Sequence, residues 1–236
     1  MEPSDNKVPK HVGIILDGNR RFSKKLMLKP WQGHEWGAKK IEKLFDWCKE
    51  YSVKELTLYT FSIDNFNRPK EEFDYLMKLF KETFEKWKNN KTIHENKIKI
   101  RFIGRTWMFA DDVQKQMKEF EEMTKDYNNY IVNFAMAYGG RAEIIDAVKK
   151  LGQDVKDGKL KVEDINENSL SSGLYLNSEP DLIIRTGGEK RLSSFLLWQG
   201  HYAELVFLDK FWPEFEKEDF VGCLEEYSNR QRRFGK

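Results

Sequence analysis

The sequence predicts an α/β fold with a single open, mostly parallel six-stranded sheet flanked by helices. Short apolar or β-branched segments alternate along the chain with longer segments of helical period. Strands that are separated by helices pair in parallel through right-handed crossovers. No Pro- or Ser-rich linker and no internal repeat divides the chain. We therefore expect one domain over residues 1–236, with flexible ends at 1–8 and 230–236.

Six segments have the composition of strands, and two of them change abruptly to charged and glycine-rich residues. An apolar run ends at Asp17, and the run Leu-Ile-Ile ends at Arg185. Strict polar–apolar alternation over 97–103 predicts a half-buried strand near a sheet edge. The predicted strands are residues 11–17, 55–61, 97–103, 130–137, 182–184 and 204–208.

The predicted helices follow from apolar residues at helical spacing and from Pro69, which fits a first turn. They are residues 34–50, 69–89, 111–126, 142–155 and 216–229, with a weaker stretch at 162–176 and one turn at 195–198. The helix after Pro69 has an apolar stripe of Phe73, Leu76, Met77, Phe80, Phe84 and Trp87. Such a stripe is ordinarily core, but it begins beside the predicted site and could line a hydrocarbon tunnel.

Composition excludes several classes of function. The net charge of +2 gives no global field that favours nucleic acid, so an anion site must be a local cluster. Cys48 and Cys223 lack CxxC spacing, which is typical of reduced core cysteines in a cytoplasmic protein. The first residues have no signal segment, and no run approaches the roughly 20 apolar residues that span a bilayer. P-loop, GxSxG and HExxH motifs are absent from the sequence.

The unusual residues follow the predicted strands, in loops 17–21, 62–68, 138–141 and 185–191. In open parallel sheets, ligands bind beyond the carboxyl ends of the strands. Asp17 could hold Mg²⁺ against phosphate oxygens there, although an aspartate after a strand is also a common turn residue. Gly187 and Gly188, next to Arg185, allow backbone amides to approach an anion. The loops together predict a site for a metal-bound diphosphate.

Other residues in these loops have both a functional and an ordinary interpretation. Guanidinium groups bind phosphate bidentately, yet most surface arginines are only solvated; the candidates are Arg20, Arg21, Arg68, Arg185 and Arg191. Phe66 in a polar loop indicates a substrate with a charged head and a hydrocarbon body. His34 could contact phosphate when protonated or cap a helix when neutral. Glu204 could be a second metal ligand, but the sequence favours a surface glutamate at a strand start.

Five segments stand out, in order, along the chain: His11-Val-Gly-Ile-Ile-Leu-Asp-Gly-Asn-Arg-Arg-Phe22, Thr57-Leu-Tyr-Thr-Phe-Ser-Ile-Asp-Asn-Phe-Asn-Arg-Pro69, Asn133-Phe-Ala-Met-Ala-Tyr-Gly-Gly-Arg141, Ile183 to Gln199 and Tyr202-Ala-Glu-Leu205. Over residues 8–235, they strongly resemble the cis-prenyltransferases, the undecaprenyl diphosphate synthase family. Asn19-Arg-Arg-Phe22 is more similar to the archaeal and eukaryotic members.

The resemblance implies Mg²⁺-dependent addition of isopentenyl diphosphate units to an allylic diphosphate starter, geranylgeranyl or farnesyl diphosphate. Each new double bond would be cis, and the product would be a long-chain, undecaprenyl-like diphosphate, the precursor of a glycosyl carrier lipid. The resemblance also implies a homodimer, a hydrophobic tunnel beside the sheet and peripheral membrane contact for product release, with no nucleic-acid partner.

By the same resemblance, Asp17 coordinates Mg²⁺ and Glu204 joins it. The starter is surrounded by Gly18, Asn19, Arg20, Arg21, Phe22 and His34. Further substrate-binding residues are expected in the next loop: Ser62, Ile63, Asp64, Phe66 and Arg68. Isopentenyl diphosphate is held by Arg185, Arg191, Leu192 and Ser193. Asn65 occupies a position credited with proton removal; because an amide is a poor base, we expect it to orient substrate while a diphosphate oxygen accepts the proton. The tail Arg233-Phe-Gly235 would reach the neighbouring subunit's site.

Three alternatives are set against membership of this family. One is an anion-binding protein for nucleotides or RNA, and the net charge of only +2 and the lack of an RNA motif count against it. A non-catalytic partner subunit of a prenyltransferase complex would tend to lose the aspartate after the first strand, and Asp17 is present. A trans-type synthase needs a DDxxD motif, and Asp111-Asp112 is followed by Val-Gln-Lys.

Overall fold

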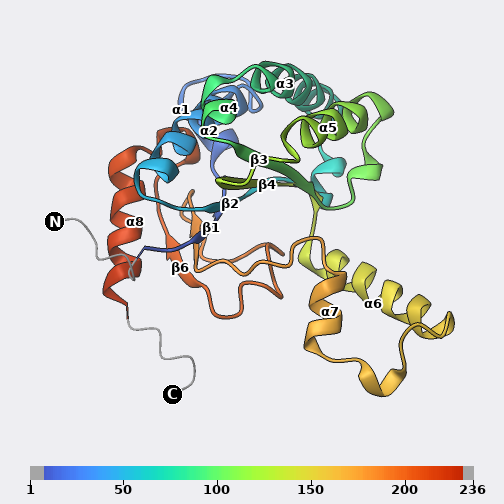
Figure 1. Ribbon diagram of the computed structural model, residues 1–236. Helices are drawn as coiled ribbons and strands as arrows, with labels where there is room; N and C mark the ends of the chain where they lie inside the picture. The colour runs from blue at the N-terminus through green and yellow to red at the C-terminus, as the bar shows by residue number, and fades with distance from the viewer. Residues whose placement is uncertain (1–7, 231–236) are drawn as a thin grey trace.

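The structure is a computed structural model that describes residues 8–230. Six strands form one sheet in the order β3-β4-β2-β1-β5-β6, and each neighbouring pair is parallel. Figure 1 shows the sheet at the centre of the chain. The strands are β1 (His11–Ile15), β2 (Glu55–Ser62), β3 (Ile98–Ile103), β4 (Tyr130–Tyr138), β5 (Leu182–Arg185) and β6 (Glu204–Phe207). The predicted fold class is confirmed, and β3 lies at an edge as expected.

Helices connect the strands. They are α1 (Asn19–Lys25), α2 (Gly33–Glu50), α3 (Lys70–Lys88), α4 (Lys91–Glu95), α5 (Asp111–Thr124), α6 (Gly140–Lys156), α7 (Glu167–Gly173) and α8 (Lys217–Asn229), with 3₁₀ turns η2 (Ile63–Asn67), η3 (Thr106–Met108), η4 (Val162–Asp164) and η5 (Trp212–Glu214). In Figure 1, α2, α3 and α5 lie on one side of the sheet, while α6 and α7 extend from the other side.

The two faces of the sheet bury separate apolar clusters because successive strand residues point to opposite faces. On β1, Ile14 belongs to the larger cluster, which includes residues of α2, α3, α5 and α8. Its neighbour Ile15 belongs to the smaller cluster, with Ile183, Phe195 and Leu196. The core is thus divided by the sheet, and the larger half lies under the helices that reach the predicted site.

Three local predictions were wrong. Residues 19–25 form helix α1 instead of a loop, because Gly18 takes φ of 104° and lets the chain turn directly into a helix. Residues 195–198 form turns instead of a helical turn. The stretch 162–176 is divided into η4 and α7, and α4 was not predicted.

The predicted flexible ends and the Arg233–Gly235 tail lie almost wholly outside the described residues. Arg230, which is described, donates to Glu204 at 2.8 Å. Within residues 8–230, no helix has the length and apolar composition needed to cross a membrane.

Candidate active site

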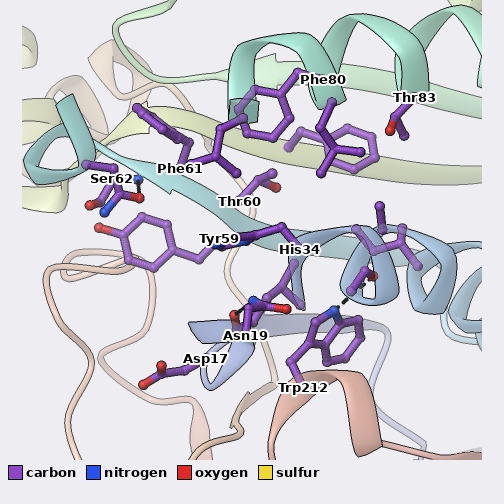
Figure 2. Close-up of a pocket in the computed structure, with 18 of the residues that line it drawn as sticks. Asp17, Asn19, His34, Tyr59, Thr60, Phe61, Ser62, Phe80, Thr83 and Trp212 are labelled. Carbon is purple, nitrogen blue, oxygen red and sulfur yellow. Dashed lines mark hydrogen bonds between the residues drawn. The ribbon is translucent and has the colours of Figure 1, made fainter. Parts of the chain in front are cut away.

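A cavity of about 460 Å³ lies at the carboxyl ends of β1 and β2, between the sheet and helices α2 and α3. Its polar part is lined by residues of the β1–α1 and β2–η2 segments, including Asp17, Asn19 and Ser62 (Figure 2). Its apolar part is lined by Ile41, Phe61, Leu76, Leu79, Phe80, Phe84, Trp87 and Phe134. One continuous cavity therefore joins charged groups to a hydrocarbon-like interior.

Asp17 and Arg185 meet because their strands are neighbours in the sheet. Ile15 of β1 is paired with Arg185 of β5, so the residue two positions beyond Ile15 lies near the Arg185 side chain. Arg185 Nη2 donates to Asp17 Oδ2 at 2.9 Å. The backbone carbonyl of Asp17 accepts bonds from the Thr186 hydroxyl at 2.8 Å and the Trp212 N–H at 2.9 Å. These contacts fix the carboxylate at the edge of the sheet.

Arg185 is a buried cation with an unused donor. Its Nη1 donates to the hydroxyl of Ser193 at 2.8 Å and to the carbonyl of Arg191. Its Nε is buried and has no hydrogen-bond partner among the described residues. Because buried polar groups are nearly always paired, an unpaired guanidinium donor fits a site that receives an anion.

Two glycines let the backbone pass close to these charged groups. At Gly18, a Cβ atom would lie 2.7 Å from Phe211, and at Gly187 it would lie 2.7 Å from Arg21 Nη2. Both residues have positive φ, 104° and 90°. A side chain at either position would collide and strain the backbone, so the turn geometry requires glycine.

Arg68 and Arg20 are held by a carboxylate that the sequence analysis did not identify. Glu72, on the first turn of α3, accepts from Arg68 Nη1 at 2.7 Å and lies 3.7 Å from Arg20 Nε. Glu72 is only 1% exposed. A glutamate in a first turn is normally solvated, so burial distinguishes it; the one sequence signal is its spacing of four residues from Arg68.

His34 lies beside these guanidinium groups. Its Nε2 is 3.3 Å from Arg68 Nη1. Burial, and then the positive charges of Arg68 and Arg20, lower the pKa of His34 to about 3. The imidazole is therefore neutral in the ligand-free protein at neutral pH. A bound anion would offset the two guanidinium charges and raise this pKa.

Arg21 lies on the other side of Asp17. Its Nη2 is 3.1 Å from Asp17 Oδ1, and its Nη1 is 3.6 Å from Glu189. The guanidinium also lies over the Phe211 ring, 5.4 Å from the ring centroid. Arg20, Arg21, His34 and Arg68 all line the cavity, so the structure brings together most of the predicted starter site.

Ser62 and Asn65 line the cavity and also shape the loop that contains them. Asn65 Oδ1 accepts from the Ser62 N–H at 3.1 Å, and the two residues cap η2 reciprocally. The structure therefore gives both residues a role in shaping the loop. Tyr59, which was not predicted, also lines the cavity and donates to the Ser193 carbonyl at 3.2 Å. Burial, and then the charge of Asp64, raise the pKa of Tyr59.

Several predicted substrate residues are not among those that line the cavity. Phe22 is buried against Trp36, with ring centroids 5.8 Å apart. Phe66 belongs to an aromatic cluster, with its ring centroid 5.1 Å from that of Phe61. Arg191 pairs with Glu189 at 2.6 Å. Five further predicted residues are also outside the lining: Ile63, Asp64, Arg185, Leu192 and Ser193. Leu192 packs on the smaller apolar cluster.

The structure does not bring Glu204 to Asp17. Glu204 opens β6 and is paired in register with Leu182, at the amino end of the sheet, whereas Asp17 follows the carboxyl end of β1. Its carboxylate accepts from Arg230 at 2.8 Å. The predicted pairing of Glu204 with Asp17 around one metal ion is therefore not formed within this chain.

Without Glu204, the protein ligands that the cavity offers fit a magnesium ion that is held mainly by substrate. Among the described residues that line the cavity, Asp17 is the only carboxylate. No group of three or more His, Cys, Asp or Glu residues in the described part of the chain could hold a metal ion. Mg²⁺ is commonly held by one or two carboxylates together with substrate phosphates. Asp17, with three arginines lining the same cavity, fits that requirement.

The fold and cavity define a class of α/β protein that binds an amphiphile by an anionic head and a hydrocarbon body. The family model described as "Putative undecaprenyl diphosphate synthase" matches residues 15–235. The chain belongs to this family of prenyltransferases.

The chain is similar to proteins named tritrans,polycis-undecaprenyl-diphosphate synthase (geranylgeranyl-diphosphate specific). It is 48% identical to the one from Pyrococcus abyssi over 97% of this chain and 88% of the relative. It is 45% identical to the one from Methanopyrus kandleri over 98% and 86%.

Two solved structures share the fold over nearly their full length. Lavandulyl diphosphate synthase from Lavandula x intermedia, in complex with dimethylallyl diphosphate, has a TM-score of 0.92 and 31% identity, covering 98% of this chain and all of that one. A probable undecaprenyl diphosphate synthase from Campylobacter jejuni has a TM-score of 0.81 and 35% identity, covering 97% and 99%.

Proposed function

We propose that this protein extends geranylgeranyl diphosphate by repeated cis addition of isopentenyl diphosphate, giving a long-chain polyprenyl diphosphate that serves as a glycosyl carrier lipid precursor. The observation that supports this most is the cavity in which Asp17 and three arginines adjoin an apolar interior. The names of the archaeal relatives favour geranylgeranyl over farnesyl diphosphate as the starter.

The starter diphosphate binds where Arg20, Arg21, Arg68 and neutral His34 converge. The guanidinium groups neutralise the anion, and Gly18 allows the backbone to pass beneath it. The hydrocarbon tail then lies in the apolar interior along α3. Because Glu72 and Asp17 hold the arginines before substrate arrives, little reorganisation is needed on binding.

Isopentenyl diphosphate binds on the β5 side of Asp17. The buried Arg185 side chain holds the loop of Ser193 and the exposed Arg191 through its Nη1, and it adds positive charge beneath this site. The two diphosphates are thus placed on either side of one carboxylate. This arrangement directs the starter's first carbon towards the double bond of the second substrate.

The reaction breaks the bond between the allylic carbon and the diphosphate oxygen, and the electron pair leaves with diphosphate. The double-bond electrons of isopentenyl diphosphate form the new carbon–carbon bond. A proton then leaves the adjacent carbon and passes to a diphosphate oxygen, while Asn65 orients the substrate. The arginines stabilise the charge that develops on the leaving group. Asp17, together with the substrate phosphates, would hold Mg²⁺, which would supply further neutralisation of that charge.

Each cycle buries about five more carbons, at roughly 0.8 kcal/mol per CH₂. Burial therefore draws the growing chain along the apolar cavity. Trp87 and Phe134 line the cavity, and their rings stack with centroids 5.4 Å apart. Along the axis of α3, Trp87 lies about 22 Å beyond Glu72. Trp87 and Phe134 are the side chains that a lengthening product meets last.

A homodimer accounts for a set of exposed apolar residues. They lie on α6, on the segment after it and on the 191–200 loop: Ile145, Val148, Val162, Ile165 and Leu197. Several exposed large apolar side chains on neighbouring segments favour contact with another protein surface. We place the single-domain enzyme in the cytoplasm, on the ground that Cys48 and Cys223 are free and buried.

The proposal is tested by incubating the purified chain alone with labelled isopentenyl diphosphate, Mg²⁺ and either geranylgeranyl or farnesyl diphosphate. Sizing the products by chromatography should reveal long cis-rich chains, with the geranylgeranyl starter preferred. Absence of product without an added second protein would favour the alternative, a non-catalytic partner subunit.

A further inference from the structure

The turn after α1 exposes a group of large apolar side chains. Met27 is 97% exposed, and its neighbours Leu26 and Leu28 are 44% and 38% exposed. Trp36, near the start of α2, is 53% exposed. Scattered exposed apolar residues need no explanation, but a contiguous group marks an interaction site. We call Leu26, Met27, Leu28 and Trp36 the apolar tip.

The members of the apolar tip belong to one surface. Leu26 follows Phe22 by one helical turn, so the two side chains share a face of α1. The Phe22 ring meets the Trp36 ring edge-on, with centroids 5.8 Å apart. The end of α1 and the start of α2 are therefore joined through Phe22, which places the exposed Leu26 and Trp36 on the same part of the surface.

The backbone at Met27 argues against a purely structural role. Helix α1 ends with the Leu28 N–H donating to Ser23 O at 2.9 Å and the Met27 N–H donating to Lys24 O at 3.1 Å. This is a Schellman motif, in which the residue at Met27's position is usually glycine. Met27 adopts φ of 57° there. The chain thus places an apolar side chain in water on a backbone that disfavours it, which indicates a function.

Lysines flank the apolar tip. Lys24 and Lys25 precede it and Lys29 follows it, and Lys25 also binds Glu214 at 2.6 Å. Apolar side chains enter the boundary between headgroups and acyl chains, while ammonium groups remain among anionic headgroups. Tryptophan is favoured at the same depth. The combination matches an anionic lipid surface better than a neutral one.

The apolar tip also lies close to the cavity mouth. Helix α1 begins at Asn19 and Arg20, which line the cavity, and seven residues of helix span about 10 Å. We propose that the apolar tip and its lysines dock this protein on an anionic membrane, with the cavity mouth facing the lipid. The reason for docking rests on the proposed function, because the product is a lipid; the docking itself can be measured without activity.

A single labelled cysteine tests the contact directly. Cys48 and Cys223 are buried, so a polarity-sensitive fluorophore can be attached selectively in a Met27→Cys variant. With vesicles containing phosphatidylglycerol, we expect a blue shift and an intensity gain, and a weaker response with pure phosphatidylcholine. Met123→Cys, at another exposed apolar position, on α5, is the matched control and should not respond. No response at position 27, or an equal one at 123, would overturn the proposal.

Vesicle sedimentation of unlabelled variants separates docking from folding and catalysis. Met27→Gly should bind phosphatidylglycerol vesicles more weakly while melting at a higher temperature, because glycine suits the positive φ. Lys24→Gln should weaken binding about fivefold. Both should elongate substrate normally in detergent. Unchanged vesicle binding by Met27→Gly would contradict the docking proposal and leave the proposed function standing. Vesicle binding by a protein that forms no product would contradict the proposed function and leave the docking proposal standing.

Discussion

Arg185 Nη2 lies 2.9 Å from Asp17 Oδ2, although the two residues are 168 positions apart in the sequence. The contact follows from the parallel pairing of β1 with β5, which aligns Ile15 with Arg185. It gives the carboxylate and the buried guanidinium fixed positions before any ligand is present. A site organised in this way spends little free energy on rearrangement when charge develops on a departing diphosphate.

Replacing Asp17 tests its role without removing its shape. Asp17→Asn should reduce elongation by about 10²–10³-fold, because the amide neither attracts a metal ion nor balances Arg185 and Arg21. Labelled isopentenyl diphosphate incorporation measures the loss. Asp46→Asn, at an exposed position on α2, should elongate normally. Undiminished synthesis by Asp17→Asn would remove Asp17 from the mechanism.

Glu72 is predicted to be a positioning residue for the starter site. Glu72→Gln leaves Arg68 without its charged partner, which should cost about 1–3 kcal/mol of stability. The Michaelis constant for the starter should rise more than that for isopentenyl diphosphate, because Arg68 and Arg20 line only the starter side. Steady-state kinetics with each substrate varied in turn measures the difference. Glu71→Gln, at the exposed neighbouring position, is the control, and equal effects of the two variants would contradict this role.

His34 should make the folded protein less stable as the pH falls. Its pKa in the folded state, about 3, lies below the ordinary value of 6.5, so between these values the unfolded chain binds a proton that the folded chain does not. Urea unfolding at about pH 7 and about pH 5 should show a smaller stability loss for His34→Gln than for the natural sequence. An equal loss would show that His34 does not titrate as its surroundings imply. The pKa of His11 is also lowered by burial, and it contributes equally to both proteins.

Trp87 is expected to limit product length. Its ring stacks on Phe134, and its Nε1–H donates to Glu42 at 3.0 Å. Trp87→Leu should open the far part of the cavity and shift the products towards longer chains, at a stability loss of about 2 kcal/mol. Trp47→Leu removes a comparably buried ring outside the cavity, so it should leave product length unchanged. Chromatographic sizing distinguishes the two variants. If Trp87→Leu made products of the same length as the natural sequence, Trp87 would not limit product length.

The sheet, and the edge of it where the site lies, could be predicted because both follow from local sequence patterns. An apolar run that stops at Asp17, and another that stops at Arg185, indicate strands with their carboxyl ends at a site. Parallel order then brings the two residues together without further information. The same reasoning located Arg20, Arg21, Arg68 and His34 at one edge of the sheet.

What could not be predicted depends on the direction and burial of single side chains. Phe66 follows a strand as the arginines do, yet its ring enters an aromatic cluster. Glu204 was predicted to begin a strand, but only the sheet register shows that it lies at the opposite end of the strands from Asp17. The turns at 195–198 replace a helical turn because Ser193, Ser194 and Leu196 take positive φ, which helix propensity does not register.

The most direct test is a structure of this protein with a non-hydrolysable geranylgeranyl diphosphate analogue. We expect the diphosphate against Arg20, Arg21 and Arg68 and the hydrocarbon along Phe80 and Phe84 of α3. A diphosphate bound away from Asp17, or a hydrocarbon tail outside the cavity, would contradict the account.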